Sequence, residues 1–215
     1  MFSLFNPDSL YSRVMNRLAD IIWLSILFII CSLPIVTIGT SMCAAYYTAV
    51  KSIRRGGGYV SKQFFKSFKQ NLLQGIIITV IYVVFGCLII NNIMLVNKNM
   101  EEVDILFTGV FAAIGFLLTG VTLICLPILS RFNLTIGKLF KMSITISFKH
   151  FLTTLELVFM FAVMIALVWF VPILIVVLPG LMIFVMTYPM ERVMKKYMPK
   201  VEKGSAEAEI WYNQE

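Results

Sequence analysis

IIWLSILFIICSLPIVTIG, residues 21–39, is the stretch that decides the fold class of this chain. It lies within 30 residues that carry no charge, residues 21–50, between Asp20 and Lys51. A straight helix of that length would be about 45 Å long, whereas the hydrocarbon core of a bilayer is about 30 Å thick. The segment is therefore too long for one membrane span and too short for two.

The composition of the whole chain supports a membrane fold. Of its 215 residues, 60% are hydrophobic and 13% are charged, whereas a soluble domain has about 25% charged residues. Because this number of polar groups is too small to cover a water-facing exterior, the apolar side chains must face lipid or one another. We expect an all-α, polytopic transmembrane helical bundle that forms one membrane domain over residues 1–215.

A helix break is predicted after the first span, at Pro34 and Gly39. The first span then covers residues 21–38 and follows an amphipathic N-terminal segment, residues 1–20. Two continuations are open: the helix kinks and runs into the inner interface, or residues 39–52 form a separate, half-length helix.

Three further apolar runs predict four more spans. The run at 151–190 contains one charge, Glu156, and is long enough for two spans that divide near Pro172. This gives five spans, or six if the half-length helix at 39–52 crosses part of the membrane. The predicted later spans are residues 72–96, 105–129, 151–170 and 171–190, and residues 191–215 form the tail.

The charges of the loops predict the orientation. Residues 51–69 carry six basic side chains and no acidic one, and residues 131–149 carry four basic side chains and no acidic one. Residues 97–104, in contrast, carry three acidic side chains and one lysine. By the positive-inside rule the basic loops and the C-terminal tail are cytoplasmic, and the acidic loop is external. The N-terminus is then outside with five spans, and inside if residues 39–52 cross the outer half of the membrane.

The basic loop at 51–69 also predicts contact with the membrane surface. Its phenylalanines lie at near-helical spacing among lysines, which is typical of a helix in the interface of an anionic inner leaflet. The predicted membrane-surface residues are Arg54, Arg55, Lys62, Lys66 and Lys69.

A short internal repetition favours five spans. Leu-Pro-Ile at 33–35 and at 126–128 ends an apolar run, and Ser-Phe-Lys follows at 67–69 and at 147–149, before the next span. Two units of span, basic helix and span in one orientation would form a parallel repeat. Chance similarity in an apolar sequence is the alternative.

The sequence contains no recognisable catalytic motif. The four cysteines are scattered singly, and His150 is the single histidine, so we predict no catalytic, cofactor-binding or metal residues and no cofactor. The basic residues lie in short blocks between uncharged stretches, which argues against nucleic acid as a partner. We expect a protein that is not an enzyme.

A few residues within the apolar runs are candidates for a role. Glu156, Gln74, Asn91 and Asn92 are the candidate intramembrane polar site, because ionisable and amide groups are costly in lipid. The alternatives are an interfacial carboxylate beside a lysine for Glu156, and interhelical hydrogen bonds for the amides. A stripe of small residues would let another helix pack closely, within this chain or from a partner; it comprises Gly109, Ala113 and Gly120.

Three segments resemble the YesL-like family of small bacterial membrane proteins. They are Asn16-Arg17-Leu18, CSLPIVTIGTSMCAAYY at 31–47, and Arg54-Arg55-Gly56 leading to FFKSFKQN at 64–71. The family pattern usually has proline after Thr-Ile-Gly, where this chain has Thr40. The family has no established activity, and its members are typically encoded beside carbohydrate ABC-transporter components. The resemblance implies a multi-pass protein of the bacterial plasma membrane.

Two functions are therefore expected. The first is an accessory or regulatory component of carbohydrate ABC transport, which would bind the lipid bilayer and transporter permease subunits. The second is a small stand-alone permease or channel, which would need a polar path through the spans. An intramembrane enzyme is a more remote alternative.

Overall fold

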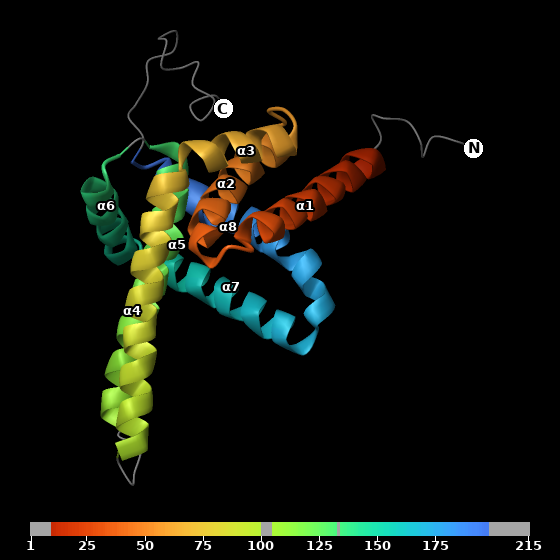
Figure 1. Cartoon of the computed structure of the whole chain (residues 1–215). Helices are drawn as coiled ribbons and strands as arrows, with labels where there is room; N and C mark the ends of the chain where they lie inside the picture. The colour runs from red at the N-terminus through yellow and green to blue at the C-terminus, as the bar shows by residue number, and fades with distance from the viewer. Residues whose placement is uncertain (1–9, 100–104, 133, 198–215) are drawn as a thin grey trace.

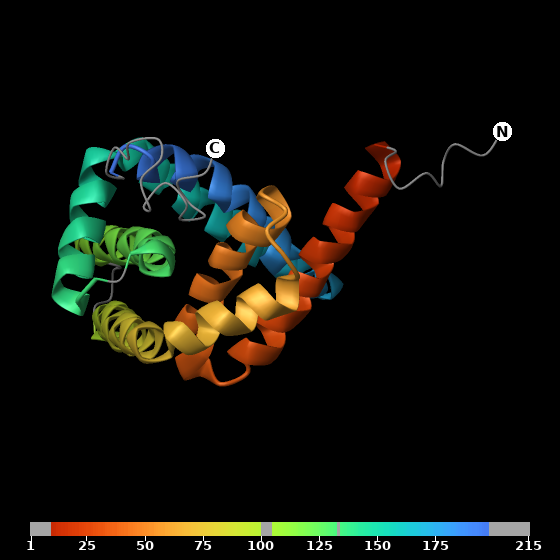
Figure 2. The same ribbon diagram turned by 90° about the horizontal axis from the view of Figure 1, so that it is seen from above.

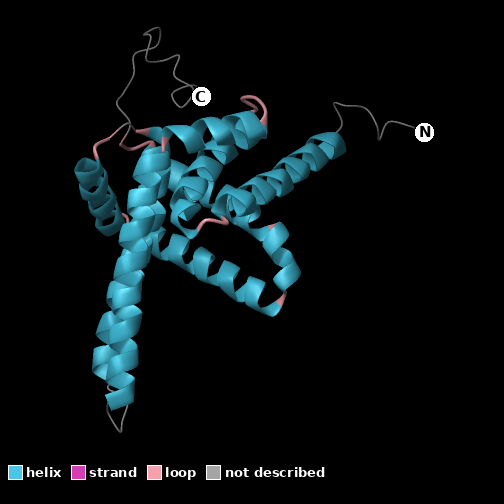
Figure 3. Ribbon diagram, in the orientation of Figure 1, coloured by secondary structure: helices cyan, strands magenta, loops and turns pink. Residues whose placement is uncertain are grey.

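The chain is built from helices, and the described residues contain no strand (Figure 1, Figure 3). The computed structural model describes residues 10–99, 105–132 and 134–197. The longer elements are α1 (Leu10–Ser32), α3 (Val60–Gln70), α4 (Leu72–Asn99), α5 (Ile105–Arg131), α6 (Ile136–Lys149), α7 (Phe151–Phe170) and α8 (Leu178–Met194). Between them lie α2 (Ile38–Thr48), the short helices η2 (Ile35–Thr37) and η4 (Pro172–Val176), and the π-helix η3 (Ala49–Arg54).

Four helices within the described residues are long and apolar enough to cross a membrane: Val14–Ser32, Leu72–Leu95, Leu106–Arg131 and Phe151–Phe170. The all-α class is thus confirmed. The first of these helices begins and ends earlier than the predicted span 21–38. It ends at Ser32 because a proline disfavours helical backbone at the residue before it, here Leu33.

The predicted fifth span, residues 171–190, is not one continuous helix. Pro172 begins the short helix η4, and α8 starts only at Leu178 and has 17 residues. Eleven of those residues are buried, and α8 contacts α1, α2, α5 and α7. The apolar side chains at 178–190 therefore serve largely for packing between helices. A count of five or six spans is accordingly not confirmed.

Of the two continuations that the sequence left open after the first span, the structure has a separate short helix, α2, which continues into η3. Nine of the 11 residues of α2 are buried, and α1, α3, α4, α5 and α8 all contact it. A helix that is apolar or small on every side can be enclosed in this way, because no face requires water. α2 is the centre of the bundle (Figure 1).

Gly39, predicted to lie at the helix break, lies inside α2 instead. The break falls at residues 33–34, and Gly39 permits close contact with α4. Its backbone nitrogen donates to Thr79 Oγ1 over 3.0 Å, and a Cβ at Gly39 would lie 3.0 Å from the carbonyl oxygen of Gly75. Close approach, rather than a break, explains this glycine.

A second close crossing joins α1 to the start of α8. The hydroxyl of Ser25 donates to the carbonyl of Val177 over 2.9 Å and accepts a bond from the nitrogen of Gly180 over 2.8 Å. A side chain at Gly180 would overlap the backbone of α1 at Ile21. The first and the last helix of the described chain are therefore joined by packing and by polar contact.

Seen along α4 and α5, the helices α3 and α6 extend sideways, across the direction of that pair (Figure 2). Both carry lysines and no acidic residue. We call the end of the bundle where they lie the basic end. At the other end, α4 and α5 project beyond the remaining helices as a two-helix hairpin (Figure 1).

Candidate functional site: a buried charge cluster

A carboxylate is buried at the basic end of the bundle. Glu191, near the end of α8, is 3% exposed. The other acidic residues whose burial is described, Asp20 and Glu156, are half-buried and exposed. Removing an ionised carboxylate from water costs several kcal/mol unless partners replace the water, so the surroundings of Glu191 must supply them.

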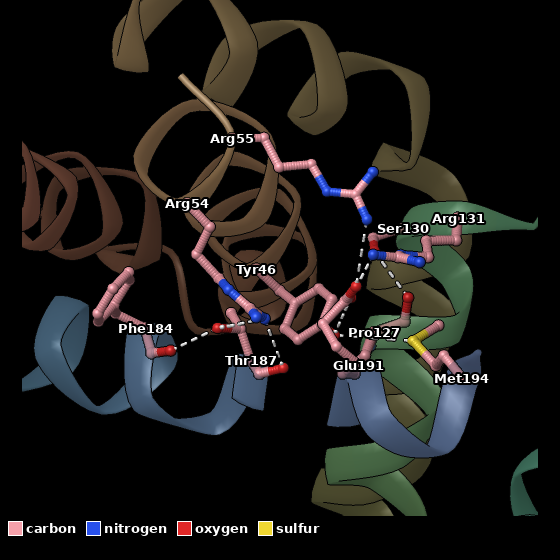
Figure 4. A network of polar contacts seen from close by, with 10 residues as sticks. All are labelled: Tyr46, Arg54, Arg55, Pro127, Ser130, Arg131, Phe184, Thr187, Glu191 and Met194. Carbon is pink, nitrogen blue, oxygen red and sulfur yellow. Dashed lines mark hydrogen bonds and ion pairs between the residues drawn. The ribbon is translucent and has the colours of Figure 1, made fainter. Parts of the chain in front are cut away.

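Three side chains surround the carboxylate of Glu191 (Figure 4). The hydroxyl of Tyr46 in α2 donates to Oε1 over 2.9 Å. Arg131, the last residue of α5, donates from Nη2 to the same oxygen and forms an ion pair with it. Nη2 of Arg55 lies 4.0 Å from Oε2. Helices distant in sequence thus meet on one carboxylate.

Arg54 docks beside this carboxylate, onto α8. Its Nη1 donates to the carbonyl of Thr187 over 3.1 Å, and its guanidinium lies 4.4 Å from the ring centroid of Tyr188. Stacking on an aromatic face suits the planar, weakly hydrated guanidinium better than it would suit a lysine. We use the name charge cluster for Tyr46, Arg54, Arg55, Arg131, Thr187 and Glu191.

The charge cluster connects α2, η3, α5 and α8. Its three arginines exceed its one carboxylate, so it carries a net positive charge at the basic end. Such a cluster can fix the arrangement of helices and favour negative charge nearby. Within the described residues no group of three His, Cys, Asp or Glu side chains could hold a metal ion.

Reasoning from the sequence placed Arg131 and Glu191 in a loop and a tail, and so missed the cluster. One signal was available. Arg131 follows the predicted span 105–129, and Glu191 directly follows the predicted span 171–190, where the next charges are basic. A lone acid at the membrane edge, among basic residues, is a candidate for an ion pair between helices.

The four residues of the predicted polar site are not brought together. Gln74, at the start of α4, donates to the carbonyl of Leu134 over 3.2 Å. Asn91 and Asn92 lie exposed toward the far end of α4, and Asn92 donates to a carbonyl of its own helix. Glu156 is exposed on α7. No single path through the bundle joins these side chains.

The predicted small-residue stripe is divided between two environments. Gly120 is buried, and a Cβ there would lie 2.5 Å from Thr154 of α7. Gly109 and Ala113 are exposed on the projecting part of α5, and a Cβ at Gly109 would meet no atom within 4 Å. One member of the stripe therefore packs inside the chain, while the other two face outward.

The predicted membrane-surface residues also divide. Lys62, Lys66 and Lys69 are exposed on α3, whereas Arg54 and Arg55 are half-buried and turn toward α8. The sequence pattern grouped them because all five lie in one basic loop. The tight turn at Gly56 and Gly58, where φ is +68° and +99°, separates the two groups.

The family described as "Protein of unknown function, DUF624" matches residues 21–93. The matched region runs from α1 to α4 and includes Tyr46, Arg54 and Arg55 of the charge cluster. It ends before Arg131 and Glu191. Comparison with curated proteins and with solved structures finds no match for the chain. These observations define a membrane-type protein whose described residues form helices, with a DUF624 match over about a third of the chain, residues 21–93.

Proposed function

We propose that the chain is a non-enzymatic accessory component of carbohydrate ABC transport, which binds permease helices through the α4–α5 hairpin. The observation that carries the proposal is the projection of this hairpin beyond the other helices (Figure 1). Its outer part exposes large apolar side chains, among them Phe85 on α4 and Phe107 on α5. Transport of carbohydrate is suggested by the resemblance to the YesL-like family, whereas the family that matches residues 21–93 is described as one of unknown function.

Small residues on the hairpin support contact with a partner helix rather than with lipid alone. Gly86 on α4 and Gly109 on α5 each have open space where a Cβ would be, and Ala113, one turn after Gly109, is exposed. Small side chains let two helix backbones approach closely, which is a main source of helix association in membranes. In this chain no described helix uses the space at Gly86 or Gly109.

A stand-alone permease is less well supported. It needs polar groups that line one path, whereas Gln74, Asn91 and Glu156 lie apart, on different helices or at opposite ends of one helix. Replacement of Glu156 by glutamine in reconstituted vesicles tests that alternative, because solute uptake dependent on Glu156 would favour a permease.

The proposal is tested by affinity purification of the tagged protein from mild-detergent extracts of native membranes. We expect transporter permease subunits in the eluate. The variants Gly86→Leu and Gly109→Leu should lower their recovery several-fold, because a side chain there blocks the close approach of a helix, while its Cβ meets no atom of this chain within 4 Å.

Val110→Leu provides the matched control. Val110 is exposed on the same hairpin and is already large, so an added methylene should leave recovery unchanged. Absence of permease subunits from the wild-type eluate, or equal loss with all three variants, would contradict the proposal.

A further inference from the structure

A cavity of about 580 Å³ opens at the basic end where three segments meet. It lies between the junction of α3 with α4 and the residues at the start of α6. Lys69, Asn71 and Gln74 line one wall, and Leu134 and Thr135 line the other. The contacts described above for the charge cluster join other residues.

Hydrogen bonds hold the two walls in place. Gln74 Nε2 donates across the cavity to the carbonyl of Leu134 over 3.2 Å, and Asn71 Nδ2 donates back to the carbonyl of Ser67 over 3.0 Å. The hydroxyl of Thr135 makes no capping bond to α6 and is exposed. The cavity is thus a recess whose two walls are joined by a hydrogen bond.

The electrostatic surroundings favour an anion. Lys69 belongs to the lining, Lys66 lies one turn earlier on α3, and Lys138 lies in the first turn of α6. The described acidic residues, Asp20, Glu156 and Glu191, are on other helices. The first turn of α6 holds no acidic residue, so its partial positive charge adds to that of the lysines.

The lining also has an apolar side. Leu73, in the first turn of α4, is 76% exposed beside Lys69 and Asn71, and α4 continues from it as a helix long and apolar enough to cross a membrane. A ligand that combines a phosphate with acyl chains matches this pairing, because the phosphate faces Lys69 while a chain lies along Leu73. A small soluble anion would make no use of the apolar surface.

We propose that this cavity binds the phosphate headgroup of an anionic phospholipid, with Lys69 as its principal charged contact. Binding at this site differs from the general attraction of a basic helix to a membrane, because the lipid headgroup occupies one recess and contacts one particular lysine. It is also independent of the transporter partner proposed above, since it requires only this chain and a lipid.

The test uses the purified, full-length protein in nanodiscs that contain phosphatidylcholine and a small fraction of phosphatidylglycerol. Native mass spectrometry after release into mild detergent measures the lipid that stays bound. We expect preferential retention of one phosphatidylglycerol. Lys69→Gln should weaken it about tenfold, the loss expected for one charge-assisted hydrogen bond.

Lys62→Gln is the matched control, because Lys62 is an exposed lysine of α3 that does not line the cavity. It should retain phosphatidylglycerol as the wild type does. Equal losses in the two variants would overturn the proposal in favour of diffuse attraction. Displacement of the lipid by inorganic phosphate at equal concentration would overturn the assignment to a lipid, and so would equal retention of phosphatidylcholine.

Discussion

Thr40 of α2 and Gly75 of α4 meet so closely that a Cβ at Gly75 would lie 2.7 Å from Cα of Thr40. Backbone cannot move aside as a flexible side chain can, so Gly75→Ala should force α2 and α4 apart. We expect a loss of about 1–3 kcal/mol in the free energy of unfolding, the usual cost of overpacking. Unfolding of the detergent-solubilised protein in a denaturing detergent measures it.

Gly86 of α4 serves as the control for that substitution. It lies on the same helix with nothing within 4 Å of its Cβ position. Gly86→Ala should leave stability unchanged or raise it by up to about 1 kcal/mol, because alanine is the better helix former. A loss of stability as large as that of Gly75→Ala would show that the α2–α4 contact is not responsible.

Single substitutions in the charge cluster should lower the free energy of unfolding by more than their combination would suggest. Glu191→Leu leaves Arg131 buried without its carboxylate, and Arg131→Met leaves Glu191 with a weaker cation partner, Arg55. Removal of one partner of a buried pair costs about 3–5 kcal/mol. The double variant should be more stable than Glu191→Leu alone, because it removes both buried charges. Additive losses in a double-mutant cycle would show that the pair does not interact.

The orientation of the bundle can be tested with single cysteines, after replacement of the four native ones. Tyr59 at the basic end and Trp169 at the end of α7 are each 84% exposed. By the positive-inside rule we expect a membrane-impermeant maleimide to label Trp169→Cys in intact cells, and Tyr59→Cys only after permeabilisation. The reverse pattern would place the basic end outside.

His150, between α6 and α7, should have a lowered pKa. Desolvation is the largest cause, followed by the charges of Lys196 and Lys149, and the ring of Tyr197 packs against the imidazole with centroids 5.8 Å apart. NMR titration of the single histidine should give a pKa below 6.5, and Lys196→Gln should raise it. A wild-type pKa at or above 6.5 would contradict this reading.

The lowered pKa of His150 has a consequence for stability. Because the unfolded chain takes up the proton more readily, the folded state loses stability as the pH falls through 6.5 toward the folded-state pKa. Below that pKa this contribution stays constant. His150→Gln, which cannot titrate there, should remove this part of the pH dependence.

Most of the long helices could be predicted from the sequence, because the runs 72–96, 105–129 and 151–170 are long enough to cross a membrane and together contain one charge, Glu156. The prediction 151–170 coincides with α7, and 72–96 and 105–129 fall within α4 and α5. The prediction 171–190 is wrong as one continuous helix, because composition does not distinguish side chains that face lipid from those that face other helices. Pro172 and Pro179 were the local warning of a break.

The charge cluster could not be predicted, because its contacts join residues far apart in the chain. Tyr46 and Glu191 are 145 residues apart, and Arg131 and Glu191 are 60 apart. Charge and position at a span edge identify residues that need a partner, but only the packing of α2, α5 and α8 determines which partner each receives. The glycines at 39, 75 and 180 are similar, since close approach is a property of two helices.

The partners that bury α2 are completed only late in the synthesis of the chain. Tyr46 emerges from the ribosome early, whereas Glu191 follows 145 residues later. Until that residue is made, the buried phenol of Tyr46 and the guanidinium of Arg131 lack the carboxylate that joins them. A chain cut short before residue 191 would therefore contain all four candidate spans and still present an unfinished interior to the proteases that remove incomplete membrane proteins.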